Sequence, residues 1–500
     1  MTTTAHLRTM FGVKLSRLRH ARHHSQSDFA RRAGLSVSYL AEIEAGKKFP
    51  KAEKILGLAA ALGISFDELI SSQVDPEFAP LKGFLDSPLI QGFPFERFGL
   101  PREQLVHLLA RSPNEVAALL RTVNDVARQY NIGVEHFLHA ALRSYQELTG
   151  NYYPELETAA LDLRAEIEAA EPGPRALGAK LDRWIATEVG LTIDSGALKT
   201  DRSLDDLRSV LIDRTRTLLL NPGLGPAQRG FTLAREAAFH RLGLTPRSAI
   251  SPPEADGSFD QVLNDFKASY VAGAVVLPRA ALLADLKRWF KQTRWHPDDL
   301  LALMDKYGVT AETLLYRLSQ LAPGEFGLKV HFLKFRAAGD DFRLVKQLNL
   351  SDLPIPAGHG GGEHYCRRWL TTRLLSDLAV RRHRHPRRGP APAPEIGVQI
   401  SRFPDEAHEY FCLGLAFPSP LAPPDPVSMT IGFRIDDRFR KTVRFAADRT
   451  VPRVLISSTC ERCPLEPEAC RDRVAPPTEY QRTLAREARA RGLVTLLGPA

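Results

Sequence analysis

The chain has 500 residues, a formal net charge of +9, 25% charged residues and 44% hydrophobic residues. This length is too great for one hydrophobic core and indicates three or four domains of an ordinary globular protein. The sequence lacks an apolar run of about eighteen residues and a signal peptide, so it predicts neither a membrane span nor secretion. We therefore expect a cytoplasmic protein, and its positive charge suits a polyanionic partner.

The stretch from Phe11 to Leu69 predicts five short amphipathic helices, because its apolar residues recur at spacings of three and four. The hydroxyls of Ser25 and Ser36 are placed to cap the second and third helices, and Gly34 allows the left-handed turn between them. Residues 1–72 contain eleven Lys and Arg against six Asp and Glu. A basic helical module of this kind is typical of proteins that bind DNA phosphates.

From Ser25 to Pro50 the sequence SQSDFARRAGLSVSYLAEIEAGKKFP resembles the XRE family of phage-type helix-turn-helix repressors. The resemblance implies that the second helix of the pair lies in the major groove of double-stranded operator DNA, with Gln26 on a backbone phosphate. It implies a salt bridge between Arg19 and Glu44, and binding as a homodimer to two half-sites. The residues that it assigns to the bases or the adjacent backbone are Ser36, Val37, Ser38, Tyr39 and Glu42.

Residues 73–150 are predicted to be a linker and helical connector, because a Pro- and Gly-rich stretch precedes helical signals at 102–110 and 113–148. The apolar spacing at 114–129 suits packing either against a second subunit or within the chain.

The stretch FTLAREAAFH at 231–240 resembles the zinc helix of the ImmA/IrrE peptidase-like family, which carries H-E-x-x-H. In that motif two His one helical turn apart bind zinc and the Glu activates a water molecule. Here Arg235 and Phe239 occupy the two His positions, and His240 lies about 100° further around the helix. We predict a degenerate α+β zincin-like domain at 151–326 with no catalytic residues and no enzyme activity. It serves either to bind a ligand and couple a signal, or as a structural body.

Two further tracts lie in this predicted domain. The sequence KRWFKQTRWH offers cations and aromatic rings for an acyl-CoA, although an amphipathic helix with a solvated basic face is the favoured interpretation. These residues are Lys287, Arg288, Trp289, Phe290, Lys291, Arg294 and Trp295. Residues 298–322 resemble a second helix-turn-helix, but their acidic content favours packing within the domain.

From Gly327 the pattern changes to short alternating strands, predicted at 328–335, 341–350, 395–403, 410–417, 428–435 and 441–447. Helical signals frame them at 365–379 and 478–491. We predict a C-terminal α+β sensor domain at 327–500 with an antiparallel sheet. Residues 381–394 are expected to form a basic surface loop, and residues 359–364 a glycine-rich turn.

Four cysteines are candidates for a metal centre, because Cys460, Cys463 and Cys470 form C-x2-C-x6-C and Cys366 lies upstream. Such a set can complete a four-thiolate shell around an iron–sulfur cluster or a structural zinc, or remain unliganded. Cys412 lies on an apolar strand and is predicted to be a buried core thiol.

The order of these three regions resembles the short-chain fatty-acyl transcriptional regulators. That resemblance implies a multidomain transcription regulator with an acyl-CoA effector and, in some members, a four-iron cluster ([4Fe-4S]) at the matching cysteines. The alternatives are a diverged metallopeptidase that acts on a partner regulator, and an interaction scaffold stabilised by zinc.

Overall fold

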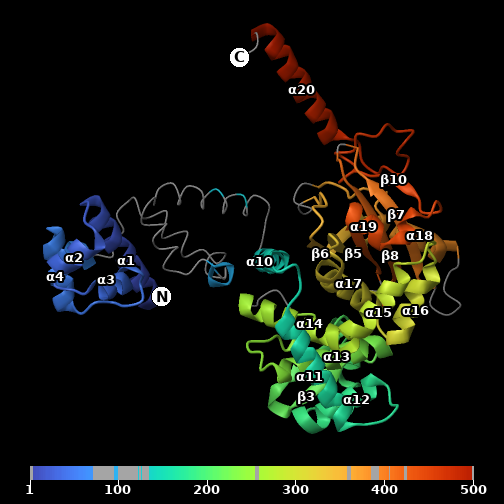
Figure 1. Ribbon diagram of the computed structural model, residues 1–500, viewed down its shortest axis with the longest axis horizontal. Coiled ribbons are helices and arrows are strands. Elements are labelled where there is room, and N and C mark those ends of the chain that lie inside the picture. Colours follow the sequence, from blue (N-terminus) through green and yellow to red (C-terminus); the bar gives the residue numbers. More distant parts are fainter. Residues whose placement is uncertain are drawn as a thin grey trace. The chain divides into compact units, whose positions relative to one another are not determined.

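The structure is a computed structural model, and Figure 1 shows its ribbon. It describes residues 4–70, 95–99, 122, 126, 134–253, 258–339, 341–356, 362–384, 393–404, 406–419, 421 and 425–497. The helix expected at 102–110 and most of the apolar stretch at 114–129 lie outside the described residues, as do residues 385–392 of the basic loop and residues 359–361 of the glycine-rich turn. The chain divides into two compact units, Met1–Ala141 and Leu142–Ala500. The domain boundaries at 72, 150 and 326 stay predictions.

The N-terminal unit contains the five helices that the sequence predicts. They are α1 (Thr4–Ala21), α2 (Gln26–Arg32), α3 (Val37–Glu44), α4 (Ala52–Leu62) and α5 (Phe66–Ile70). Their apolar faces meet in one core, in which Leu15, Phe29, Leu40 and Leu58 are fully buried. Each such side chain stabilises the bundle by about 1.5–3 kcal/mol. Beyond the bundle, the structure describes a short 3-10 turn, Phe95–Phe98, and α10 (Val134–Leu148), which crosses the division between the units.

The first half of the second unit combines helices with a small sheet. The helices are α11 (Pro154–Ala170), α12 (Leu177–Trp184), α13 (Pro226–Arg241), α14 (Phe259–Val276), α15 (Arg279–Trp289), α16 (Pro297–Tyr307) and α17 (Ala311–Phe326). The sheet has the order β1 (Thr192–Asp194), β3 (Thr217–Leu220), β2 (Ser209–Ile212) and β4 (Ile250–Ser251). Only the β1–β3 pairing is parallel, so the sheet is mixed. This is the α+β arrangement predicted for the degenerate peptidase-like domain.

The pair α16 and α17 packs within this unit, as the sequence predicts. Leu300, Leu314, Leu315 and Leu318 are fully buried, so the apolar faces of both helices point into the protein. Within the described residues, no single helix is long and apolar enough to cross a membrane; only α14 and α15 together, bent by 67°, have the length and composition to do so.

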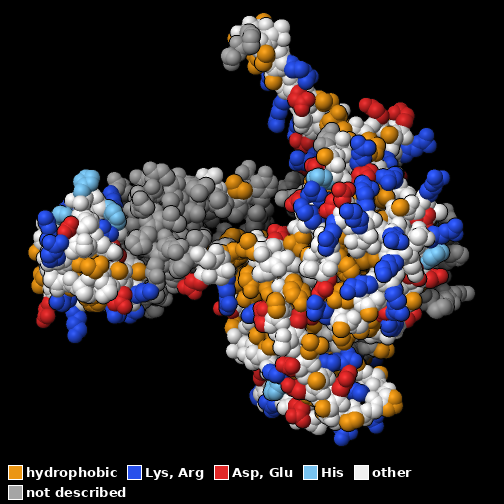
Figure 2. All heavy atoms as spheres, in the orientation of Figure 1, with side chains coloured by type: hydrophobic (Ala, Val, Ile, Leu, Met, Phe, Trp, Pro, Cys, Tyr) orange, Lys and Arg blue, Asp and Glu red, His pale blue; other side chains and the backbone are white. Residues whose placement is uncertain are grey.

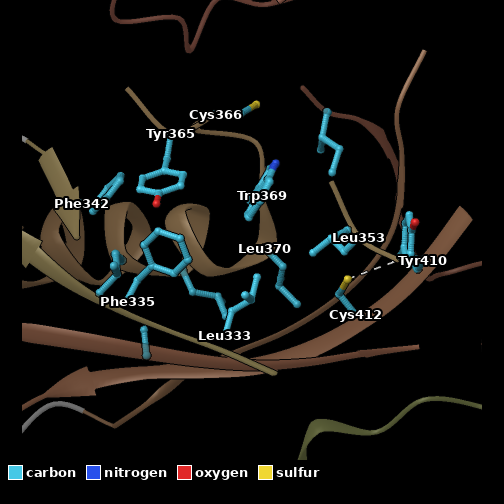
Figure 3. Packing of buried hydrophobic residues seen from close by; sticks show 14 of the residues in the cluster. Leu333, Phe335, Phe342, Leu353, Tyr365, Cys366, Trp369, Leu370, Tyr410 and Cys412 are labelled. Carbon is cyan, nitrogen blue, oxygen red and sulfur yellow. Dashed lines mark hydrogen bonds between the residues drawn. The ribbon is translucent and has the colours of Figure 1, made fainter. Parts of the chain in front are cut away.

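A six-stranded sheet forms the C-terminal part. Its order is β10 (Arg453–Leu455), β7 (Glu395–Arg402), β8 (Glu409–Pro418), β9 (Pro426–Arg434), β5 (Val330–Ala338) and β6 (Asp341–Asn349). The prediction of an antiparallel sheet needs correction, because the short strand β10 pairs with β7 in parallel and makes the sheet mixed. The helix α18 (Leu370–Arg384) covers one face, where Leu333, Phe335 and Trp369 belong to the buried cluster of Figure 3.

One predicted strand is wrong. Residues 441–447 lie in a helix α19 (Asp437–Thr442) and a 3-10 turn, Arg444–Ala447. The carboxylate of Asp436 accepts a hydrogen bond from the N–H of Phe439 at 2.8 Å and so caps the helix. The alternation of apolar residues that suggested a strand instead buries Phe439 and Phe445 among other aromatic rings. The last helix, α20 (Thr478–Leu497), has no buried residue.

Candidate DNA interface and cysteine site

The turn between α2 and α3 has the geometry that the sequence predicts. Ser25 accepts a hydrogen bond from the N–H of Asp28, and Ser36 accepts one from the N–H of Tyr39 at 3.2 Å. Each serine therefore satisfies a backbone donor that the helix itself leaves free. Gly34 has a φ of +64°, a left-handed conformation that costs other residues conformational energy. Both helices are thus fixed by short-range signals in the sequence.

A buried ion pair joins α1 to α3. Arg19 donates from Nε to Glu44 Oε1 at 2.6 Å and from a terminal nitrogen to Oε2 at 2.9 Å, which confirms the predicted salt bridge. Gln26 Nε2 donates to the same carboxylate at 3.0 Å. The Gln26 side chain is thus held from within the protein at the start of α2, and its contact with a phosphate stays a prediction.

The remaining predicted DNA-binding residues lie at the N-cap of α3, Ser36, and in the first two turns of the helix. Ser36, Val37 and Ser38 are exposed, and Val37 shows 46% of its surface although it is apolar. Tyr39 is half-buried against the core, so its ring is positioned by packing. An exposed aliphatic side chain beside hydroxyl groups suits contact with thymine methyl groups and base edges. The base contacts themselves stay predictions.

Sequence reasoning missed Lys48, which follows α3. Its ammonium lies 2.7 Å from a Glu42 carboxylate oxygen and 5.7 Å from the centre of the Tyr39 ring. Glu42 is therefore paired with a cation in the protein, and its contact with DNA stays a prediction. The Gly-Lys-Lys sequence directly after the helix was a signal for this contact, because a turn there brings the lysines back beside α3.

The degenerate zinc helix is α13, and an internal ion network occupies the positions of the zinc ligands. Arg235 donates to Asp265 of α14 at 2.8 Å, with both side chains nearly buried. Glu236, at the position of the catalytic Glu, accepts two hydrogen bonds from Arg247 at 2.7 and 2.8 Å. Phe239 lies between the two guanidiniums, 4.9 Å from Arg235 and 3.9 Å from Arg247.

These contacts do not fit a zinc site. Burial lowers the pKa of Arg235, but Asp265 and Glu236 oppose this effect, and the nearby guanidinium is a cation where a metal ion would have to bind. Burial raises the pKa of Asp265, and one of its buried oxygens, Oδ2, has no hydrogen-bond partner. Arg235 and Phe239 therefore replace two metal ligands by groups that cannot donate electrons to zinc.

Two segments dock together at the cysteines. Tyr365 and Thr459 form an antiparallel bridge, and the N–H of Cys460 donates to the carbonyl of His364 at 2.8 Å. The N–H of Cys366 donates to the carbonyl of Ser458 at 3.3 Å. These bonds place Cys366 beside the C-x2-C loop although 94 residues separate the two in sequence.

Charged side chains reinforce this docking. Glu363 accepts hydrogen bonds from Arg462, the shortest at 2.6 Å, and from the hydroxyl of Thr459 at 2.7 Å. Glu461 lies 2.7 Å from His364 Nδ1 and accepts a bond from the His364 N–H at 2.9 Å. His364, which the sequence placed in a glycine-rich turn, thus helps to hold the two cysteine-bearing segments together.

The four cysteines are all buried and neighbour one another. Burial raises the pKa of the Cys366 and Cys470 thiols, and neighbouring thiols raise it further: Cys460 and Cys463 for Cys366, and Cys463 for Cys470. Their exposed fractions are 5% or less. Figure 3 shows the Cys366 sulfur pointing out of the aromatic cluster that surrounds its neighbours Tyr365 and Trp369. The four thiols are thus near one another, and their binding of a metal stays a prediction.

Backbone donors surround these sulfurs. Burial raises the pKa of the Cys366 thiol to about 11, while N–H groups of Ser457 and Arg368 act in the opposite direction. Burial also raises the pKa of Cys460, against N–H groups of Val474 and Ala475. Such N–H groups stabilise thiolates, the form in which cysteine binds a metal. Within the described residues, no group of three or more His, Cys, Asp or Glu side chains lies in a metal-binding arrangement.

The fifth cysteine, Cys412, is a buried core thiol, as predicted. It is 7% exposed, and burial raises its pKa to about 12. Its sulfur lies 3.8 Å from His331 Nε2, and burial lowers the pKa of that imidazole to about 3. Both groups therefore remain neutral at ordinary pH. A cavity of about 20 Å³ beside them is large enough for one water molecule.

The tract from Lys287 to Trp295 begins in the last turn of α15 and has a buried apolar side and an exposed basic side. This confirms the interpretation of an amphipathic helix with a solvated basic face. Trp289 and Phe290 are 4% and 2% exposed and pack against Phe445, so they offer no stacking surface to a ligand. The cations at 287, 288 and 291 lie on the exposed side.

Comparison with known proteins identifies two regions. A helix-turn-helix family model matches residues 15–69, and the IrrE N-terminal-like domain matches residues 193–319. The chain is similar to a propionyl-CoA carboxylase regulator from Cereibacter sphaeroides, with 24% identity over 66% of this chain and 68% of the relative. It is also similar to the HTH-type transcriptional regulator RamB from Mycobacterium tuberculosis, with 24% identity over 67% of this chain and 70% of the relative. The uncharacterized HTH-type transcriptional regulator YazB from Bacillus subtilis is 40% identical over 60 residues, which are 12% of this chain and 87% of the relative.

Proposed function

We propose that this chain, which belongs to the HTH-type transcriptional regulators and carries an IrrE N-terminal-like domain, couples operator binding to a short-chain acyl-CoA signal. The observation that carries the DNA-binding half is the set of exposed residues on α3, a helix that Ser36 caps and that a buried ion pair joins to α1. A rigid helix with an exposed, uncrowded face is what major-groove reading requires. The regulator works where its operator is, so we also propose a cytoplasmic location.

We expect substitutions on α3 to change which DNA sequence the protein selects. In the variant Val37→Ala/Ser38→Ala/Tyr39→Phe, the side chains assigned to bases are shortened while the helix keeps its Ser36 cap. Each lost base contact is worth about 1–3 kcal/mol, so affinity for the wild-type operator should fall at least about tenfold. Selection from a random duplex pool, with wild type and variant in parallel, measures this change.

The matched control for α3 is Leu56→Ala in α4, which also shortens an exposed aliphatic side chain, 55% exposed. It should leave the selected sequence unchanged. If the α3 variant enriches the same sequences as the wild type with the same affinity, α3 is not the reading helix.

The acyl-CoA half of the proposal is supported by the name of one relative, a propionyl-CoA carboxylase regulator. An effector controls DNA binding only if it has different affinity for the DNA-competent and DNA-incompetent states. A homodimer is the simplest form in which such states differ, because two half-sites respond to the separation of two modules. The mass of the protein in solution tests the dimer, and a monomeric mass at micromolar concentration would rule it out.

We further propose that Cys366, Cys460, Cys463 and Cys470 hold a four-iron cluster, with structural zinc as the alternative. Their shared burial, thiol donors and surrounding N–H groups support a thiolate-bound centre. Bound there, such a group would supply redox or oxygen sensitivity. The chain's own residues hold the two segments together through Glu363–Arg462 and His364–Glu461.

The IrrE-like region is proposed to have no peptidase activity. Its support is the Arg235–Asp265 pair and the Phe239 ring, which stand where metal ligands are needed. The region would then serve either to bind a ligand and couple a signal, or as a structural body. Release of a peptide from a partner regulator by the purified protein would refute this proposal.

A further inference from the structure

The hairpin formed by β5 and β6 carries two pairs of like charges directly opposite each other. Lys334 pairs with Lys346 across the strands, and Arg336 pairs with Arg343. Leu333, Phe335, Phe342 and Leu344 turn toward the α18 cluster, so both cationic pairs lie on the opposite face of the hairpin. Like charges directly opposite in a sheet are destabilising. Two such pairs in succession therefore oppose the folding of the hairpin.

Protection of a sheet edge does not explain these cations. Charged side chains on an edge strand prevent unwanted pairing, and β6 is an edge strand. Lys334 and Arg336, however, belong to β5, which lies between β9 and β6 and has no free edge. The positive charge on the inner strand thus needs another reason.

Two residues from other segments add a further cation, Arg208, and a single carboxylate, Glu312. Glu312 of α17 lies 2.8 Å from Lys334 Nζ, 3.7 Å from Lys346 Nζ and 4.0 Å from a terminal nitrogen of Arg208. Burial alone would raise the pKa of Glu312, but the three cations lower it well below its usual range. Glu312 thus stays ionised and compensates one charge of the three.

The two arginines of the hairpin have no acidic partner among the described residues. Arg336 Nε is buried and lacks a hydrogen-bond partner, which is costly for a charged donor. Arg343 is exposed, and the nearby Asp341 is paired with Arg367 at 3.5 Å. With Arg208, Lys334 and Lys346, the face has five cations against Glu312, a formal surplus of four. We call these six residues the cationic face.

The two lysines of the cationic face are held in place. Lys346 Nζ lies 3.6 Å from the centre of the Tyr316 ring, a cation–π contact, and the Tyr316 hydroxyl accepts a bond from Gln146 at 2.7 Å. The Lys334 side chain is only 12% exposed, whereas Lys346 and Arg208 are 39% and 37% exposed. Figure 2 shows that Lys and Arg side chains are interspersed with Asp and Glu on the face of the second unit in view.

We propose that the cationic face binds the phosphate groups of a small molecule that carries at least two of them. Arginine forks bind phosphate through two parallel hydrogen bonds, and lysine adds a point charge. The recessed Lys334 suits a compact phosphate more than a DNA backbone, which needs projecting side chains. That the ligand is a CoA thioester rests on the proposed effector role. That the face binds phosphate groups does not depend on that role.

The test compares Arg343→Gln/Lys346→Gln with the wild-type full-length chain. Calorimetry with inorganic pyrophosphate, CoA and CoA lacking the 3′-phosphate should show affinity reduced at least about tenfold in the variant. Removing like charges should also raise the melting temperature without ligand and abolish the rise that ligand gives the wild type. A purely structural role of these side chains predicts the opposite, a lower melting temperature.

The control variant is Lys287→Gln/Lys291→Gln, which removes two exposed cations of the same unit and should bind as the wild type does. If the control loses binding and the hairpin variant keeps it, the site lies at α15 and the proposal is overturned. Binding of pyrophosphate but not CoA supports the phosphate site and removes the effector proposal. Equal binding of the phosphate ligands by the wild type and both variants overturns the site and leaves the effector proposal standing. If the hairpin variant loses affinity for DNA alone, the cationic face binds DNA and the proposal is overturned.

Discussion

Replacing Arg19 with Ala is expected to destabilise the N-terminal module by about 3–5 kcal/mol, because it leaves a buried carboxylate without its main partner. The Glu44 side chain is 0% exposed, and after the change only Gln26 would donate to it. A loss of this size approaches the whole stability of a small domain. Hydrogen exchange followed by mass spectrometry on the full chain should show lost protection in residues 4–70, and operator affinity should fall with it.

Two further variants distinguish the effect of losing the buried ion pair from the effect of removing any charged side chain. Arg31→Ala removes an exposed partner of Asp28, 77% and 54% exposed, and should change stability by about 1 kcal/mol or less. The double variant Arg19→Met/Glu44→Met leaves no buried charge and should recover much of the lost protection. Unchanged exchange in Arg19→Ala would show that the ion pair does not hold α1 to α3.

The second large effect is expected in metal content. Protein purified without oxygen should contain iron and sulfide and absorb visible light, and Cys366→Ser or Cys460→Ser should remove both signals. Cys412→Ser should retain the metal, because that thiol lies on the sheet beside His331. Iron-free, colourless protein with one zinc per chain would show that the cysteines hold zinc rather than a cluster. Metal-free protein would overturn both proposals.

A variant of the degenerate helix α13 provides a control for the metal measurement. Arg235→His/Phe239→His restores H-E-A-A-H, with Asp265 of α14 nearby as a further oxygen donor. This variant should gain about one zinc per chain relative to the wild type, which separates zinc at α13 from metal at the cysteines. No gain would show that the fold around α13 no longer has the shape of a zinc site.

Structural features that depend on residues close together in the sequence were predictable. The caps at Ser25 and Ser36, the turn at Gly34 and the five helices depend on contacts over three or four residues. The Arg19–Glu44 bridge came from the resemblance, and the structure confirms it.

Features set by the fold were not predictable. The cationic face depends on the register of β5 with β6 and on Arg208 and Glu312 from elements far apart in sequence. The burial of Trp289 and Phe290 depends on Phe445, which the sequence placed on a strand. Alternating apolar residues at 441–447 suit a strand and an aromatic core equally well, and the Asp436 cap decided for a helix.

The proposed regulator requires that an acyl-CoA bound in the second unit change DNA binding by the first. The affinity of the full-length protein for its selected operator, measured with propionyl-CoA, with free CoA and without ligand, tests this coupling. Coupling energies of allosteric proteins are about 1–3 kcal/mol, so we expect propionyl-CoA to change the affinity about 5- to 150-fold and free CoA to change it less. Operator affinity that is the same in all three conditions would show that the two units are not coupled by this ligand.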